Sequence, residues 1–146
     1  MTVANPTLTI IGIDTVAVVV SDRRRALRWF REVLDLPVAY IGPAIPHPNP
    51  TIQGSSNNRG HWIELGLGRP MTRVHLCELG DHKVEPGPTG ITFLTNNITA
   101  EYERLKSKGV RFVNSPKEME WGEWLCAFLD PDGNEFDLKQ PQQTEK

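Results

Sequence analysis

Histidines and carboxylates are the residue types in this sequence that could bind a metal ion or transfer a proton. Glu78 is the candidate general base, because a carboxyl group whose pKa is raised by its neighbours can accept a proton. His75 precedes it at an odd spacing on the same predicted strand, so the two side chains point to opposite faces of the sheet. A structural or solvated role is therefore our interpretation for each of the four histidines, His47, His61, His75 and His82. The sequence contains no glycine-rich phosphate loop, nucleophile elbow or Ser-His-Asp spacing.

Tryptophans are the second group of residues that could contact a ligand. Trp62, Trp121 and Trp124 lie on or beside late strands of the two halves of the chain. Flat aromatic side chains bind planar ligands and cations well. The alternative is that such side chains fill the core or an interface. The sequence favours exposure for Trp62 and Trp121 and leaves both alternatives open for Trp124.

Composition narrows the class of protein. The chain has 146 residues, and 38% hydrophobic and 23% charged side chains are typical of one soluble globular domain. A formal net charge of −2 argues against a nucleic-acid-binding protein. The longest apolar run, Val16–Val20, is far too short to span a membrane, and no signal peptide is recognised. Cys77 and Cys126 lie in apolar runs and are interpreted as reduced core thiols, so we expect a cytoplasmic protein.

Hydrophobic periodicity predicts the elements that position these residues. β-branched and apolar runs predict strands over residues 10–20, 38–41, 62–67, 73–79, 91–95, 110–113, 124–129 and 135–138. Helical spacing predicts one helix after Ser21-Asp22 and a second after the cap Thr99. The order strand-helix-strand-strand-strand occurs twice, which indicates an internal duplication in which Thr15 aligns with Gly90. We expect one domain over residues 9–140, with module one at 9–80, module two at 86–140, and a polar tail at 141–146.

Four stretches of the sequence carry a resemblance to a known family. They are residues 13–22 (IDTVAVVVSD), 33–36 (VLDL), 100–110 (AEYERLKSKGV) and 128–138 (FLDPDGNEFDL). With these four stretches in this order and spacing, the chain resembles the vicinal oxygen chelate superfamily, which includes glyoxalase I, bleomycin-resistance proteins and extradiol dioxygenases. The resemblance covers residues 9–140 and implies an α+β fold, the glyoxalase/bleomycin-resistance fold. In it, two paired βαβββ modules form curled mixed sheets around a cavity.

The resemblance also implies where a divalent metal ion would be bound in metal-dependent members. Each module contributes one residue from its first strand, usually His, and one from its last strand, usually Glu. In this chain these positions fall at Thr15, Glu78, Gly90 and Asp137. Threonine is a poor ligand and glycine has no side chain, so we expect no metal site and no cofactor. The alternative is a divalent metal ion such as Mg²⁺, held loosely by the two carboxylates and water.

Strand alternation, combined with the geometry of the family, predicts the lining of the cavity. The residues expected to face inward are Thr15, Ala17, Val19, Val74, Leu76, Glu78, Gly90, Thr92, Leu94, Glu135 and Asp137. The residues that alternate with these along the strands are expected to pack under the helices. They are Val16, Val18, Val20, Ile91, Phe93, Phe136 and Leu138. This lining places the three carboxylates of Glu78, Glu135 and Asp137 in the cavity. Because buried carboxylates need partners, we expect the cavity to contain water or a ligand that carries hydrogen-bond donors or a positive charge. The alternative places Glu135 in solvent and pairs Asp137 with Arg or Lys.

A small-molecule-binding protein without a metal site is the predicted function, similar to resistance proteins that sequester a drug. The predicted ligand-binding residues are Thr15, Trp62, Glu78, Thr92, Trp121, Trp124, Glu135 and Asp137. The alternative is a glyoxalase-like metal-dependent lyase, isomerase or dioxygenase with a degenerate site, in which Glu78 is a ligand or base. A third alternative, a protein-association module, has no positive feature in the sequence. The resemblance further implies a homodimer, and we expect no nucleic-acid or membrane partner.

Overall fold

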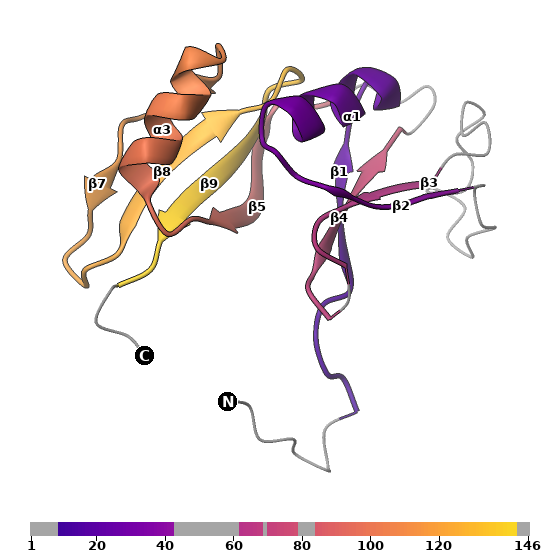
Figure 1. Cartoon of the computed structure of the whole chain (residues 1–146), viewed down its shortest axis with the longest axis horizontal. Coiled ribbons are helices and arrows are strands. Elements are labelled where there is room, and N and C mark those ends of the chain that lie inside the picture. The colour runs from indigo at the N-terminus through magenta and orange to yellow at the C-terminus, as the bar shows by residue number, and fades with distance from the viewer. Residues whose placement is uncertain (1–8, 43–61, 69, 79–83, 143–146) are drawn as a thin grey trace.

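The computed structural model describes residues 9–42, 62–68, 70–78 and 84–142, which form two similar modules. Module one contains β1 (Thr15–Val19), α1 (Arg23–Glu32), β2 (Val38–Gly42), β3 (Trp62–Leu65) and β4 (Arg73–Cys77). Module two contains β5 (Gly87–Leu94), α3 (Ile98–Ser107), β6 (Arg111–Phe112), β7 (Lys117–Glu118), β8 (Trp124–Leu129) and β9 (Asn134–Gln140). Apart from the short β7, each module has the predicted order of one strand, one helix and three strands (Figure 1). The predicted α+β class is therefore confirmed.

Each module forms its own mixed sheet. The strand orders are β1-β4-β3-β2 and β5-β9-β8-β6, with β7 paired to β8. The first and last strands of each module, β1 with β4 and β5 with β9, run parallel, and the other pairs are antiparallel. Each helix crosses over between the first and second strands of its module and lies on one face of that sheet (Figure 1).

Local sequence explains where the two helices begin. The Asp22 carboxylate accepts a hydrogen bond from the backbone N–H of Arg25 and caps α1. Asn97 caps α3 in the same way by accepting from Ala100, so the cap lies two residues before the predicted Thr99. Neither helix, nor any other in the described part of the chain, is long and apolar enough to cross a membrane.

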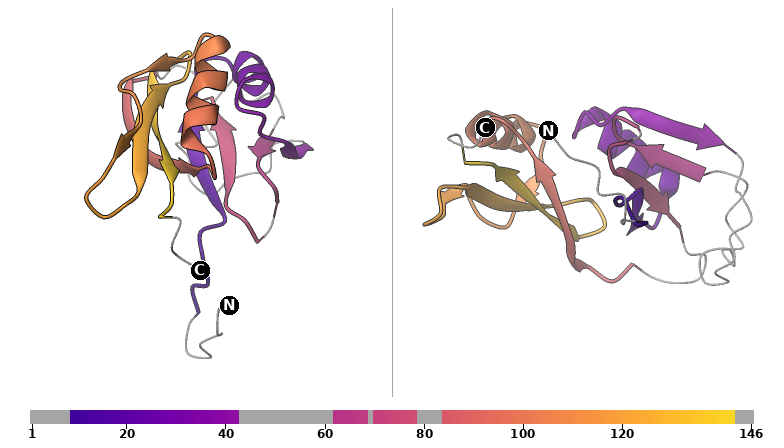
Figure 2. Two further views of the ribbon diagram at one scale, coloured as in Figure 1. Left: turned by 60° about the vertical axis from the view of Figure 1, so that its left-hand side comes forward. Right: turned by 90° about the horizontal axis from the view of Figure 1, so that it is seen from below.

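The helix-bearing faces of both sheets share one hydrophobic core. Phe30 of α1 is fully buried, and its ring centroid lies 6.0 Å from that of Phe136 on β9. Trp29 of α1 lies 6.5 Å from Phe128 on β8, so α1 packs against the sheet of the other module. The C-terminal ends of the two helices also meet, because Arg104 forms an ion pair of 3.1 Å with Asp35 (Figure 2). The modules are thus joined through their helical sides.

Each sheet has one face that turns away from its helix, here called the outer face. Alternation along the strands and the register between them determine which residues lie on it. In module two the predicted alternation is confirmed: Phe136 and Leu138 are buried in the core, whereas Thr92, Leu94 and Asp137 are exposed. In module one the prediction was wrong for two residues on β4. Val74 and Leu76 pair with Val16 and Val18 and lie in the shared core. The residues of β4 on the outer face are Arg73, His75 and Cys77.

Candidate functional site

An aromatic stack lies on the outer face of module one, where β3 and β4 are adjacent. The rings of Trp62 and His75 are stacked, with centroids 3.7 Å apart and an interplanar angle of 13°. The Trp62 indole N–H donates a hydrogen bond of 2.7 Å to the carboxylate of Glu64, two residues along the same strand. Glu64 is the register partner of His75, so strand pairing places these three side chains together. The stack and the hydrogen bond both fix the orientation of the Trp62 ring.

A buried guanidinium group supports this stack from one side. Arg73 is only 5% exposed, and it contacts Glu64 at 2.7 Å and Asp14 at 2.8 Å. Its Nε is buried and has no hydrogen-bond partner in the described part of the chain, which costs about 1–3 kcal/mol when no water compensates. We call Asp14, Trp62, Glu64, Arg73 and His75 the Trp62 cluster.

Two of the predicted site residues of module one take different positions relative to the Trp62 cluster. Thr15 lies beside it, because its hydroxyl donates a hydrogen bond of 2.6 Å to the Asp14 carboxylate. Glu78 does not lie on the outer face. Its carboxylate accepts a hydrogen bond of 3.1 Å from the backbone N–H of Arg23 and lies 4.0 Å from the Arg23 Nε. The structure therefore places Glu78 at the N-terminus of α1, where an anion is stabilised by the helix dipole.

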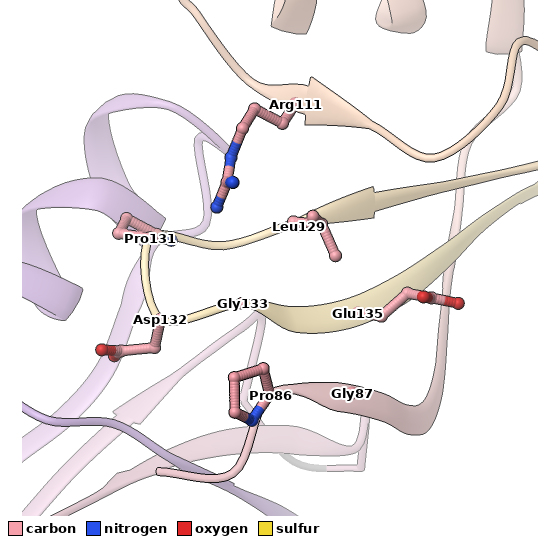
Figure 3. A pocket seen from close by; sticks show the side chains of 8 residues that line it. All are labelled: Pro86, Gly87, Arg111, Leu129, Pro131, Asp132, Gly133 and Glu135. Atoms are coloured by element: carbon pink, nitrogen blue, oxygen red, sulfur yellow. The ribbon is translucent and has the colours of Figure 1, made fainter.

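The predicted residues of module two lie on its outer face in two neighbouring rows. Thr92 is the register partner of Asp137, and both are exposed. Glu135 lies in the next row, in a shallow pocket of about 440 Å³ at the end of the β8–β9 hairpin. Figure 3 shows the residues that line it: Pro86, Gly87, Arg111, Leu129, Pro131, Asp132, Gly133 and Glu135. The Arg111 side chain points toward the Pro131–Asp132 turn, whereas Glu135 points away from that turn (Figure 3).

The other two predicted tryptophans do not join the Trp62 cluster. Trp121 is 58% exposed beside the β7–β8 connection, and its indole N–H donates a hydrogen bond of 2.6 Å to Glu123. Trp124 pairs with Gln140 on the helix-facing side of β8 and packs against the shared core. The structure thus supports the core alternative that the sequence left open for Trp124.

The strand register changes which residue of module one matches Asp137. Asp137 pairs with Thr92, and the duplication aligns Thr92 with Ala17. Since the register partner of Ala17 is His75, the equivalent of Asp137 is His75 and not Glu78. Sequence reasoning missed this because it aligned the acidic residues of the last strands. No local signal in the sequence gives this equivalence, because the β5–β9 register shifts between Pro88 and Thr92.

The residues at the family's metal positions differ in the donor atoms that they offer. The Thr15 hydroxyl is bonded to Asp14, and Gly90 has no side chain. The His75 ring is stacked on Trp62 at 3.7 Å between centroids, a contact that leaves the question of in-plane coordination by its nitrogens to experiment. No group of three or more His, Cys, Asp or Glu side chains suited to a metal occurs within residues 9–42, 62–68, 70–78 and 84–142. His47, His61 and His82 lie outside the described residues.

Both cysteines are free and buried, as the sequence predicts. Burial raises the pKa of the Cys126 thiol to about 11, and the nearby Asp137 carboxylate adds to this increase. Burial also raises the pKa of the Cys77 thiol, although the positive charge of Arg23 partly opposes the effect. Since the thiolate is the reactive form, neither cysteine is suited to act as a nucleophile.

Comparison with known proteins identifies the family. The profile of the Glyoxalase/Bleomycin resistance protein/Dioxygenase superfamily matches residues 12–138, and the chain belongs to this superfamily. It is 31% identical over 129 residues to the protein YetH of Bacillus subtilis (strain 168), described as uncharacterized, covering 88% of this chain and 97% of YetH.

Solved structures agree with this assignment. A superfamily member from Sphaerobacter thermophilus DSM 20745 is 26% identical with a TM-score of 0.71, and the match covers 92% of this chain and all of that chain. TnmS3, an antibiotic binding protein from Streptomyces sp. CB03234, is 24% identical with a TM-score of 0.72. That match covers 92% of this chain and 98% of TnmS3 and shows that the fold is shared.

Proposed function

We propose that this protein binds an organic small molecule on the outer faces of its sheets and sequesters it without turnover and without a metal ion. The observation that carries the proposal is the Trp62 cluster, a half-buried aromatic ring fixed by a stack and a hydrogen bond on the outer face. A ring that is already ordered loses little side-chain entropy when a ligand packs on it. The antibiotic-binding role of TnmS3, which has the same fold, supports a ligand of this kind.

The chemistry of the cluster supports binding rather than catalysis. Both oxygens of Glu64 are engaged, one by Arg73 and the other by Trp62, so this carboxylate is not positioned to accept a proton from a substrate. Glu78, the predicted base, contacts the N-terminus of α1. Thr92, Glu135 and Asp137 would extend the binding surface on module two.

A titration of intrinsic fluorescence tests the binding proposal. A library of planar organic compounds is screened for quenching of tryptophan fluorescence and for an increase in Tm. We expect saturable hits that are lost in Trp62→Leu and retained in the matched variant Trp121→Phe, because Trp121 has no ring stacked on it within the described chain. Hits that survive Trp62→Leu but not Trp121→Phe would contradict the proposed site.

One observation favours the second candidate, a glyoxalase-like metal-dependent lyase, isomerase or dioxygenase. His75 and Asp137 are residue types that bind divalent ions, and they occupy equivalent positions in the two modules. Elemental analysis of the purified protein, before and after chelation and reloading with Zn²⁺, Mn²⁺, Ni²⁺ or Fe²⁺, separates the two candidates. We expect no retained ion and no increase in Tm on reloading. About one tightly held ion per chain would overturn the metal-free proposal.

We further propose that the protein acts as a cytoplasmic homodimer. Ile10, Ile11 and Ile13, before β1, are 84%, 92% and 66% exposed, and such adjacent apolar side chains favour contact with a second copy. Light scattering on wild type and Ile11→Glu tests this assembly. A dimer that becomes a monomer in the variant supports it, and a wild-type monomer at all concentrations would contradict it.

A further inference from the structure

The shallow pocket at the end of the β8–β9 hairpin contains a positive and a negative side chain with an apolar one between them. Arg111 of β6, Leu129 of β8 and Glu135 of β9 are register partners in one row across the sheet. Register partners point to the same face of a sheet, so these three side chains lie together on the outer face of module two. All three line the pocket of about 440 Å³ (Figure 3).

The two charged side chains of this row are unpaired within the described residues. Neither the Arg111 guanidinium nor the Glu135 carboxylate forms a hydrogen bond or an ion pair there. Glu135 does accept a hydrogen bond of 2.8 Å from the Thr89 hydroxyl, but through its backbone carbonyl. A third charged residue, Asp132, also lines the pocket and is already paired with Arg25 at 3.0 Å. One guanidinium and one carboxylate are therefore available to a ligand.

The walls of the pocket are held in place by the main chain. Gly87 donates its N–H to the Gly133 carbonyl at 3.1 Å and so joins the start of β5 to the hairpin. Gly133 has a φ of 85°, and a Cβ at this position would lie 2.9 Å from Pro86. Glycine thus allows the two segments to approach closely. A pocket whose walls are already ordered requires little rearrangement when a ligand enters.

We infer that this pocket binds a small zwitterion, with an anionic group at Arg111, a cationic group at Glu135 and an apolar stretch over Leu129. A guanidinium binds carboxylate and phosphate groups through parallel N–H donors, and a carboxylate accepts hydrogen bonds from an ammonium group. A ligand with only one charge would cover the other charged side chain without pairing it, which costs free energy.

The spacing of the strands sets the length of the ligand. Arg111 and Glu135 are separated by β8, and two spacings between neighbouring strands place their backbones about 10 Å apart. The opposite charges of the ligand are therefore separated by a chain of several carbons. This inference goes beyond the proposed function, because every residue of the pocket belongs to module two and none belongs to the Trp62 cluster.

Three probes that share one straight eight-carbon chain test the inference. ω-Aminooctanoate carries both charges, N-acetyl-ω-aminooctanoate keeps only the carboxylate, and ω-aminooctanamide keeps only the ammonium group. Each is titrated into the full chain at neutral pH and low ionic strength, and backbone amide shifts in nuclear magnetic resonance spectra give the Kd and locate the site. We expect ω-aminooctanoate to bind about threefold more tightly than either other probe, with shifts at Leu129, Gly133 and Glu135.

Two variants assign the charges one at a time. Arg111→Gln should bind ω-aminooctanoate and ω-aminooctanamide equally, because the partner of the carboxylate is gone. Glu135→Gln should bind ω-aminooctanoate and N-acetyl-ω-aminooctanoate equally, because the partner of the ammonium group is gone. A change of shape alone would alter the affinity for all three probes alike.

Strand β7 provides matched controls. Lys117→Gln and Glu118→Gln each remove one charge from an exposed side chain outside the pocket, and both should retain the preference for ω-aminooctanoate. Thermal unfolding confirms that each variant folds. If one pocket variant does not fold, the other variant with its own pair of probes decides the test.

The outcomes separate this inference from the proposed function. Absence of binding to the wild type, or equal binding of the three probes, would overturn the inference. A preference that survives both pocket variants, or that is lost in the β7 controls, would overturn it as well. Shifts at Trp62 and His75 in place of the pocket would show that the probes occupy the Trp62 cluster, which would overturn the inference and support the proposed function.

Discussion

Replacing Asp132 by alanine should destabilise the protein through the joint between the two modules. Asp132 lies in the β8–β9 turn of module two, and its side chain is only 10% exposed. Its carboxylate accepts hydrogen bonds from the backbone N–H of Ser21 at 3.1 Å and from the Ser21 hydroxyl at 2.6 Å. It also forms an ion pair with Arg25 at 3.0 Å. All three partners belong to module one, at the entry to α1.

The size of the effect follows from the exposure of these partners. A buried hydrogen bond to a charged acceptor contributes about 1.5–3 kcal/mol to stability. Because Ser21 is exposed, we assign about 1 kcal/mol to each of its two hydrogen bonds with Asp132. The Arg25 side chain is half exposed, and such ion pairs contribute about 0.2–1 kcal/mol. We therefore expect Asp132→Ala to lower the free energy of unfolding by about 2–3 kcal/mol.

Urea denaturation followed by circular dichroism measures this loss as a lower midpoint at unchanged m. Ser21→Ala is the control, because it keeps the backbone hydrogen bond to Asp132 and removes the hydroxyl, which donates to Asp132 and accepts from Arg25 at 3.0 Å; with both groups exposed, it should cost about 1 kcal/mol. The double variant should lose less than the sum of the two single variants, since both remove the same contact. A loss below about 0.5 kcal/mol for Asp132→Ala, or full additivity, would refute the view that this turn joins the modules.

Three further predictions concern the core and its ionisable groups. Phe30→Ala should cost about 3–5 kcal/mol in urea denaturation, because the fully buried ring packs against Phe136, and a loss under about 1 kcal/mol would contradict the shared core. Burial raises the pKa of the Asp130 carboxyl, so the folded state binds this proton more tightly than the unfolded state. Stability relative to Asp130→Asn should therefore be highest at acid pH and fall as pH rises through the raised pKa, as urea midpoints across that range would show. The Cys126 thiol, whose pKa is raised to about 11 by burial and by Asp137, should react with a disulfide reagent at neutral pH only on unfolding, and rapid labelling of the native protein would exclude this.

The fold was predictable because its signals are local and occur twice. The segment FLDPDGNEFDL forms the β8–β9 hairpin with the expected turn, and Phe136 and Leu138 face the core as alternation requires. In β4 alternation failed, because all five residues from Arg73 to Cys77 are buried and both faces of the strand are covered. A strand covered on both faces has no exposure pattern that could fix its register. This is why Glu78 was matched to Asp137 in place of His75.

The Trp62 cluster depends on contacts that no local pattern contains. Asp14 and Arg73 are far apart in sequence and meet only because β1 and β4 pair in parallel. Trp62 was predicted to face a ligand from its residue type and its place beside a late strand, whereas its partner His75 was interpreted as structural or solvated. The interpretation of His75 agrees with its burial, but its stacking on Trp62 requires the register between β3 and β4.

The backbone at Gly90 determines what a substitution at this position would cost. Gly90 stands at a position where the resemblance implies a metal ligand, and its φ is 76°. A residue with a Cβ in this left-handed region is strained by about 1–2 kcal/mol, although space around it is free. Gly90 lies in the stretch of β5 where the register with β9 shifts, between Pro88 and Thr92. A side chain introduced at position 90 therefore acts against the local backbone conformation, even though the space around it is free.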